Sequence, residues 1–214
     1  GATGSTGQLL VQAALAQGHE VLAFVRRTGV LRPQPRLRIV QGSLQNPQDL
    51  LSAFTGADAV ISCLGQRPSL RAFCLGSHFQ RHSLPAIIAA INSAQVPRFI
   101  LQSSFGAGAS AAQAGWFLRT FLYGLIAKKM FDDKAIAEQA LAQCQANWTA
   151  VYPVTLVSRP ALPTAELTPL NTVQQVPGIP LLPFANVALA LLQLLPMQHY
   201  AGEKLLLAPP GAWR

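Results

Sequence analysis

Charged residues and cysteines are scarce in this chain of 214 residues. Only 11% of the residues are charged and 50% are hydrophobic, a balance that excludes an intrinsically disordered chain. No apolar run reaches the ~18–20 residues that span a bilayer, so we predict no transmembrane segment. Three cysteines, Cys63, Cys74 and Cys144, are odd in number and lack metal-ligand spacing. They predict a reducing, cytoplasmic location and roles in core packing.

Acidic residues are also few. Eight Asp plus Glu against 16 Lys plus Arg leave a net charge of +8, which suits nucleic acid, an anionic membrane surface or a phosphate-rich cofactor. One short segment holds five arginines, namely Arg26, Arg27, Arg32, Arg36 and Arg38. The sequence has no nucleic-acid-binding motif. We therefore predict that part of this cluster faces a cofactor, the alternative being a solvated basic edge.

Strand and helix patterns alternate along the chain, which is typical of a parallel sheet with helices on both faces. Buried strands are predicted at 20–25, 36–41, 58–64, 98–103, 148–154 and, with a weaker pattern, 204–207. Helices are predicted at 6–17, 47–54, 85–94, 115–127, 130–145 and 187–195. Asn46 and Asn186 are expected to be helix N-caps, and Gly18 a C-cap. Pro85 is expected to delay or kink its helix.

The chain opens on the glycine-rich segment Gly1-Ala2-Thr3-Gly4-Ser5-Thr6-Gly7, directly before a helix and then a strand. Glycines let the backbone turn tightly and approach a pyrophosphate, and the helix N-terminus offers free N–H groups to it. Thr3, Ser5 and Thr6 add hydroxyl donors. The pattern predicts a dinucleotide-binding, Rossmann-type α/β fold, a doubly wound parallel sheet with helices on both faces.

In such a fold the glycine loop follows a strand, whereas here Gly1 stands first. We expect a strand of roughly five to eight residues to precede Gly1 in the natural protein. Residues 1–214 are predicted to form one domain. The segment at about 155–185, rich in Pro and Thr, is predicted to cap the substrate side of the sheet, because loops at that edge carry specificity.

The residues at the end of the strand predicted at 20–25 indicate which cofactor is preferred. The strand there ends in Phe24-Val25-Arg26-Arg27, with no carboxylate to bind the ribose 2′-hydroxyl of NAD(H). An arginine at this place accommodates the 2′-phosphate of NADP(H). We therefore predict that NADP(H) is preferred over NAD(H), with Arg26 as the main phosphate ligand and Arg27 assisting.

Several segments together resemble the NmrA-like, atypical short-chain dehydrogenase/reductase family, nearest to its NADPH-dependent flavin reductase and biliverdin-IXβ reductase type. They are GATGSTG, FVRR, DAVISCLG, RFILQSSFGAG, DKAIAEQAL and NWTAVYP, between Gly1 and about Leu195. Ser43 stands where the family has an aspartate. Besides the glycine loop and the two arginines, the resemblance implies cofactor contacts from Ser43, Leu44, Cys63, Leu64, Gly65, Gln66, Arg67, Ser103, Pro153 and Val154.

Short-chain dehydrogenases commonly use a Tyr-x-x-x-Lys pair, in which lysine lowers the pKa of the tyrosine. Lys134 is the lysine best placed for this role, but Met130 stands four residues before it. Tyr123 is followed by Lys128 at five residues, one too far. We therefore predict an atypical enzyme that lacks the pair.

Resemblance to the flavin reductase type implies hydride transfer that rests mainly on positioning. Ser104, Ser103 and Lys134 are the candidate catalytic residues, with Ser104 orienting the acceptor. The alternative for the two serines is capping of a strand end. The alternative for Lys134 is a surface ion pair with Glu138 at i,i+4.

The predicted function is NADPH-dependent reduction of a flavin, a quinone or a similar conjugated acceptor. Two alternatives stay open, a non-catalytic dinucleotide-binding sensor or assembly protein and a nucleotide-sugar epimerase or dehydratase. The expected partner is a small-molecule acceptor rather than nucleic acid, and the protein is expected to be a monomer or homodimer.

His78 and His82 share a helical face without a third ligand, so no metal site is predicted. The apolar face at 116–125 predicts core or dimer packing, with a lid or a membrane-surface contact as the alternative.

Overall fold

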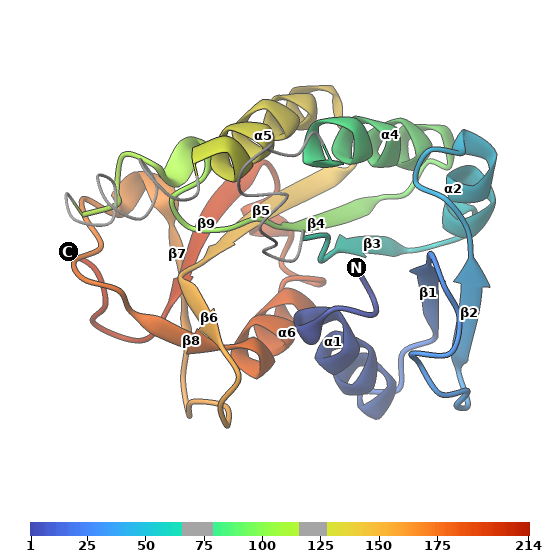
Figure 1. Cartoon of the computed structure of the whole chain (residues 1–214), viewed down its shortest axis with the longest axis horizontal. Helices are drawn as coiled ribbons and strands as arrows, with labels where there is room; N and C mark the ends of the chain where they lie inside the picture. The colour runs from blue at the N-terminus through green and yellow to red at the C-terminus, as the bar shows by residue number, and fades with distance from the viewer. Residues whose placement is uncertain (66–78, 116–127) are drawn as a thin grey trace.

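A computed structural model describes residues 1–65, 79–115 and 128–214, without the side chains of residues 128 and 130. Helices in these ranges cover both faces of a central sheet (Figure 1). One face carries α2 (Pro47–Phe54), α4 (Phe79–Ser93) and α5 (Lys128–Glu138). The other face carries α1 (Ser5–Ala16) and α6 (Phe184–Gln193), which pack against each other. This is the layered α/β arrangement that the alternating pattern predicts.

The central sheet has five strands in the order β3-β4-β5-β9-β7. Their bounds are β3 (Ala59–Ser62), β4 (Arg98–Gln102), β5 (Asn147–Pro153), β9 (Glu203–Ala208) and β7 (Glu166–Pro169). The first four strands run parallel, and β7 pairs antiparallel with β9. Side chains of β4, β5 and β9 form the centre of the core, because helices cover both faces of these strands. The sheet is therefore mostly parallel, as predicted.

Two further strands, β1 (Val21–Val25) and β2 (Leu37–Gln41), form a separate parallel pair. In Figure 1 this pair stands beside β3, and in the described ranges no ladder of hydrogen bonds joins β1 to β3. The expectation that a strand precedes Gly1 stays a prediction.

Several predicted helix ends are confirmed. The helix at 47–54 has the predicted bounds, and the Asn46 side chain accepts a hydrogen bond from the Gln48 N–H at 3.1 Å. Gly18 has a φ of +88° just after α1, and its N–H donates to the Leu15 carbonyl at 3.0 Å. These are the contacts of an N-cap and of a left-handed C-terminal glycine. The predicted helix at 130–145 divides into α5 and the 3-10 turn η3 (Gln139–Gln143).

The expected late start of the helix at Pro85 and the expected N-cap at Asn186 are both wrong. Pro85 lies inside α4, which runs from Phe79 to Ser93, and the alternative of a kink at the proline stays a prediction. Asn186 is no N-cap, because α6 begins at Phe184 and Asn186 is buried within it. Its side chain instead accepts from the Leu162 N–H at 2.9 Å and donates to the Leu162 carbonyl at 3.0 Å. Asn186 therefore anchors the segment predicted to cap the sheet.

That segment contains the short parallel strands β6 (Thr155–Val157) and β8 (Leu181–Pro183), as well as β7 of the main sheet. β8 contacts α6. The predicted helix at 115–127 lies almost wholly outside the described residues. In the ranges that the structure describes, no helix has both the length and the apolar character needed to cross a bilayer.

The contact between Asn186 and Leu162 gives a prediction for stability. Asn186→Ala leaves two partly buried backbone groups of Leu162 without their side-chain partner, so the free energy of unfolding falls by about 1 kcal/mol or more. Gln193→Ala removes an exposed amide from the same helix and changes stability by less than about 0.5 kcal/mol. Urea unfolding measures both. Equal stabilities of the two variants would contradict the anchoring role of Asn186.

Candidate functional site

The glycine loop leads into an uncapped helix. α1 begins at Ser5 with Gly4 as its N-cap, and within the described ranges no side chain caps its first turn. The first amides of a helix lack intrahelical acceptors, so they are available to an anion. The Gly4 N–H donates to the Gly1 carbonyl at 3.0 Å. A Cβ on Gly7 would collide with the Gly1 carbonyl and lie 2.8 Å from the Ala2 Cα. The loop is thus a tight cradle that suits a phosphate group.

The same loop meets the carboxyl ends of two strands. Gly1 lies against the Cys63–Leu64 peptide directly after β3. Ala2 packs on the small cluster that contains Val25, the last residue of β1. Arg26 and Arg27 follow Val25 and are exposed. The structure therefore brings the glycine loop, the end of β1 and the end of β3 to one edge, with two exposed arginines next to the end of β1.

The turn after β2 uses Ser43 locally. The Ser43 Oγ accepts from the Gln45 N–H at 3.2 Å, and the Ser43 N–H donates to the Asp49 Oδ2 at 2.9 Å. Leu44 is half-buried against the main core. The carboxylate at this turn belongs to Asp49 rather than to residue 43, a position that sequence reasoning did not consider.

The Cys63 thiol is partly buried beside Gly1. Burial raises the pKa of Cys63 to about 12, so the thiol stays protonated at neutral pH and is a poor nucleophile or metal ligand. The described residues contain no group of three His, Cys, Asp or Glu side chains that could hold a metal ion. Leu64 is half-buried and Gly65 exposed, while Gln66, Arg67 and His78 lie outside the described residues.

A second polar cluster lies at the end of β4. The Lys134 ammonium on α5 donates to the Ser104 Oγ at 2.5 Å. Ser103 donates to one oxygen of Glu138, and the Tyr152 hydroxyl on β5 donates to the other at 2.7 Å. Ser103, Glu138 and Tyr152 are all buried. The three candidate catalytic residues thus lie together, joined by two residues that sequence reasoning had not placed in the site.

Burial controls the protonation of this cluster. It lowers the pKa of Lys134 to about 8, although the negative charges of Glu138 and Asp133 act in the opposite direction. Burial also raises the pKa of Tyr152, and the charge of Glu138 and the hydrogen bond to it add to that rise. Tyr152 therefore remains a neutral donor. Lys134 titrates close to neutral pH, which is the property of a group that exchanges protons.

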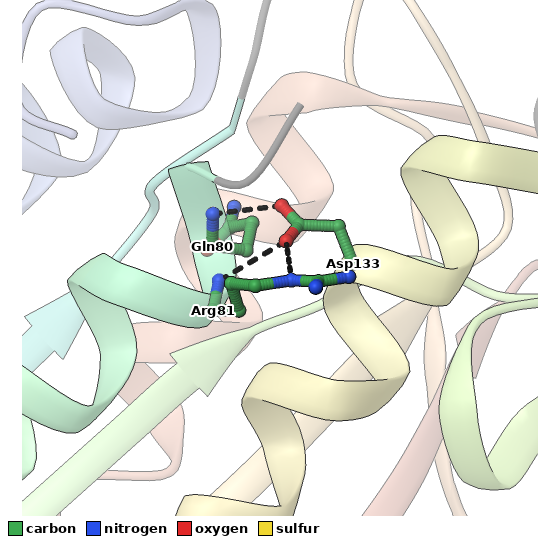
Figure 2. Close-up of polar contacts among 3 residues, drawn as sticks. All are labelled: Gln80, Arg81 and Asp133. Atoms are coloured by element: carbon green, nitrogen blue, oxygen red, sulfur yellow. Dashed lines mark hydrogen bonds and ion pairs between the residues drawn. The ribbon is translucent and has the colours of Figure 1, made fainter. Parts of the chain in front are cut away.

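Asp133, the neighbour of Lys134, fixes the start of α4 (Figure 2). Its Oδ2 accepts from the Gln80 N–H at 2.8 Å, and its Oδ1 accepts from the Arg81 N–H at 3.3 Å and the Arg81 Nε at 3.0 Å. The Gln80 side chain in turn donates to the Leu64 carbonyl at 2.9 Å. These contacts join the loop after β3, beside Gly1, to the helix that carries Lys134.

The ion pair between Lys134 and Glu138 is not formed in the described structure, because the Lys134 ammonium donates to Ser104 instead. Lys134 is only partly exposed. The surface-pair alternative for this lysine is therefore wrong.

The prediction that the chain lacks Tyr-x-x-x-Lys needs a correction. The spacing occurs once, at Tyr200 and Lys204. Tyr200 ends the 3-10 turn η5 (Gln198–Tyr200), and Lys204 lies near the start of β9, at the amino end of the sheet. The glycine loop and Ser104 lie at the carboxyl end. The pair is thus remote from the candidate site.

Pro153 and Val154 lie at the same edge of the sheet, and backbone groups of both form hydrogen bonds within the protein. The Phe105 N–H donates to the Pro153 carbonyl at 2.9 Å, and the Val154 N–H donates to the Leu207 carbonyl at 3.1 Å. A cofactor contact from these two residues stays a prediction, and it would have to use carbonyl lone pairs.

A family model described as NAD(P)H-binding matches residues 1–196. The chain belongs to this family. The glycine loop and the open start of α1 are therefore parts of a nucleotide-binding domain.

Sequence relatives include reductases of plants. The chain is 33% identical to pinoresinol reductase 2 of Arabidopsis thaliana over 119 residues, which are 50% of this chain and 34% of that protein. It is 29% identical to an uncharacterised chloroplastic protein of Arabidopsis thaliana over 187 residues, 82% of this chain and 64% of that protein. The match thus spans less than two thirds of either relative.

Solved structures show the same fold. A short-chain dehydrogenase/reductase of Veillonella parvula in complex with NADP has a TM-score of 0.82 at 19% identity, covering 100% of this chain and 94% of that chain. An anaerobillin reductase from Escherichia coli O157:H7 has a TM-score of 0.77 at 18% identity, covering 97% and 93%. The predicted Rossmann-type α/β fold is confirmed.

Two alanine substitutions in the glycine loop should have different effects. In Gly7→Ala the new methyl group meets backbone, so we expect the variant to lose about 1–3 kcal/mol of stability as well as NADPH affinity. In Gly4→Ala the methyl would lie 3.3 Å from the Gly1 carbonyl, at an extended N-cap position with φ −79°. This variant should lose less stability than Gly7→Ala but bind NADPH weakly, because the methyl group keeps the pyrophosphate from close approach to the backbone. Thermal unfolding and an NADPH titration separate the two, and equal stabilities would contradict the geometry of the loop.

Proposed function

We propose that this protein is an NADPH-dependent reductase of a flavin, a quinone or a similar conjugated acceptor. The observation that carries the proposal is the contact between Lys134 and Ser104, 2.5 Å long, at the same sheet edge as the glycine loop. An uncapped helix start suits a pyrophosphate. A lysine that titrates near neutral pH, held on a hydroxyl, suits proton delivery to a reduced acceptor.

Each part of the edge has a role in this proposal. The amides at the start of α1, with the hydroxyls of Thr3, Ser5 and Thr6, bind the pyrophosphate. Arg26, assisted by Arg27, binds the 2′-phosphate of the adenosine. When bound, the reduced nicotinamide supplies a hydride equivalent. Ser104 orients the acceptor by a hydrogen bond, and the Lys134 ammonium gives the acceptor one proton and regains a proton from water.

The proposed class of acceptor follows from the proton donors that the site offers. The acceptor needs no proton before it takes a hydride if it is electron-poor and conjugated. The nearby hydroxyls of Ser103 and Tyr152 already donate hydrogen bonds to Glu138. We therefore assign the contact with the acceptor to Ser104 and Lys134. A cytoplasmic location, a monomeric or homodimeric state and a small-molecule partner stay predictions.

The reductase assay follows NADPH oxidation with FMN, quinones and azo dyes as acceptors. Turnover should exceed the no-enzyme rate, and Lys134→Met should lower kcat roughly a hundredfold because its proton donor is gone. Lys204→Met, at the other end of the sheet, is the matched control and should keep the activity. Absence of turnover with every acceptor despite tight NADPH binding would overturn the proposal in favour of a dinucleotide sensor.

The preference for NADPH predicts a selective loss in Arg26→Ala. Removing a charge-assisted contact to the 2′-phosphate should weaken NADPH binding by about tenfold or more while NADH binding stays nearly unchanged. Arg38→Ala, which removes another exposed arginine of the same basic segment, should leave both affinities unaltered. Calorimetric titration measures all four. An equal loss for both cofactors in Arg26→Ala would exclude the proposed role.

A further inference from the structure

Glu138 is a buried carboxylate at the end of α5 for which the proposed reaction has no direct use. Only 8% of its surface is exposed. Both of its oxygens are occupied by hydroxyl donors, those of Ser103 and Tyr152. Gly108, with a φ of +49°, lies so close that a Cβ there would collide with the Glu138 carboxylate. The end of β4, strand β5 and the turn at Gly108 thus enclose one ionisable group, and burying a charge is costly unless hydrogen bonds or an opposite charge compensate it.

The position of Glu138 relative to Lys134 indicates that function. The two residues are four apart on α5, one helical turn, so they lie on the same face. They hold adjacent serines, because Glu138 binds Ser103 and Lys134 binds Ser104. Both side chains also line one small pocket, together with Gln80 and Gln102. The buried carboxylate of Glu138 and the partly buried ammonium of Lys134 are therefore each bound to one hydroxyl of the same serine pair.

We propose that Glu138 is a positioning residue that keeps Lys134 in its ammonium form and fixes the Ser103–Ser104 segment beneath the acceptor. Without this carboxylate, a buried lysine loses its proton more readily, because burial favours the neutral amine. Glu138 itself gives up no proton and touches no acceptor. The inference rests on the proposed function for its role in catalysis, but the coupling of the two charges is a property of the protein alone.

Other charges near Lys134 are accounted for in the described part of the chain. Asp133 on α5 also favours the ammonium, but its oxygens are bound to Gln80 and Arg81 of α4. Arg81 is ion-paired to Asp133 at 3.0 Å. Tyr152 on β5 is a neutral donor to Glu138. Glu138 is thus the acidic group whose removal should alter Lys134 most.

The test titrates Lys134 directly. The chain has four lysines, Lys128, Lys129, Lys134 and Lys204, so lysine labelled with carbon-13 at Cε gives few signals, and Lys134→Met assigns the one of interest. In the unaltered protein the Lys134 signal should titrate near pH 8. In Glu138→Gln the transition should move to lower pH by about one unit, since an opposite charge has been removed.

Tyr152→Phe is the matched control. It removes a hydrogen bond to the same carboxylate but leaves the charge, so the Lys134 transition should stay where it is or nearly so. An unchanged transition in Glu138→Gln would overturn the inference. So would equal shifts in the two variants, because they would indicate a structural effect rather than an electrostatic one.

A second variant covers the case in which Glu138→Gln does not fold. Replacing a buried acceptor together with its donors by apolar groups of similar shape can be nearly neutral for stability, so Glu138→Leu is combined with Ser103→Ala and Tyr152→Phe, the two hydroxyl donors to Glu138. The Lys134 transition should again move to lower pH, and an unmoved Lys134 transition in this variant would overturn the inference as well. Neither titration needs turnover, so failure of the reductase assay and failure of this inference are distinguishable. If turnover is observed, the alkaline fall of kcat should begin at lower pH in Glu138→Gln.

Discussion

The parallel alignment of β3, β4 and β5 determines where the polar chemistry of this protein lies. Parallel strands end at the same edge, so residues from three distant parts of the chain meet there. The Cys63–Leu64 peptide follows β3 and touches Gly1, while Ser103 and Ser104 follow β4. Tyr152, near the end of β5, reaches Glu138 from the neighbouring strand. The packed apolar side chains of these strands hold the strand ends in place. The positions of the strand ends in turn determine the distances between the site residues.

Helix α5 places ionisable side chains at that edge of the sheet. Within six residues it carries Asp133, which holds the start of α4, Lys134, which holds Ser104, and Glu138, which holds Ser103. Burial lowers the pKa of Lys134, and the negative charges of Glu138 and Asp133 oppose that change. A lysine in such surroundings titrates near neutral pH instead of remaining a permanent cation.

Local chemistry made part of the structure predictable from the sequence. Asn46 and Gly18 act through neighbours within three residues, and both predictions are confirmed. Asn186 has the same residue type as Asn46, yet its partner is Leu162, 24 residues away, and no local pattern indicates that contact. Lys134 could be chosen from its place on the helix. The partners of Glu138 are 35 and 14 residues away, so its role depends on strand order and could not be predicted from spacing.

Whether one sheet edge holds both the dinucleotide and the proton donor can be measured by a two-dimensional proton–nitrogen NMR titration with NADPH. If the dinucleotide binds at this edge, the amide signals of Gly4, Ser5, Thr6 and Gly7 should shift saturably, together with that of Ser104. Saturable binding whose shifts leave these amides unchanged, and fall at another part of the chain, would contradict binding at this edge.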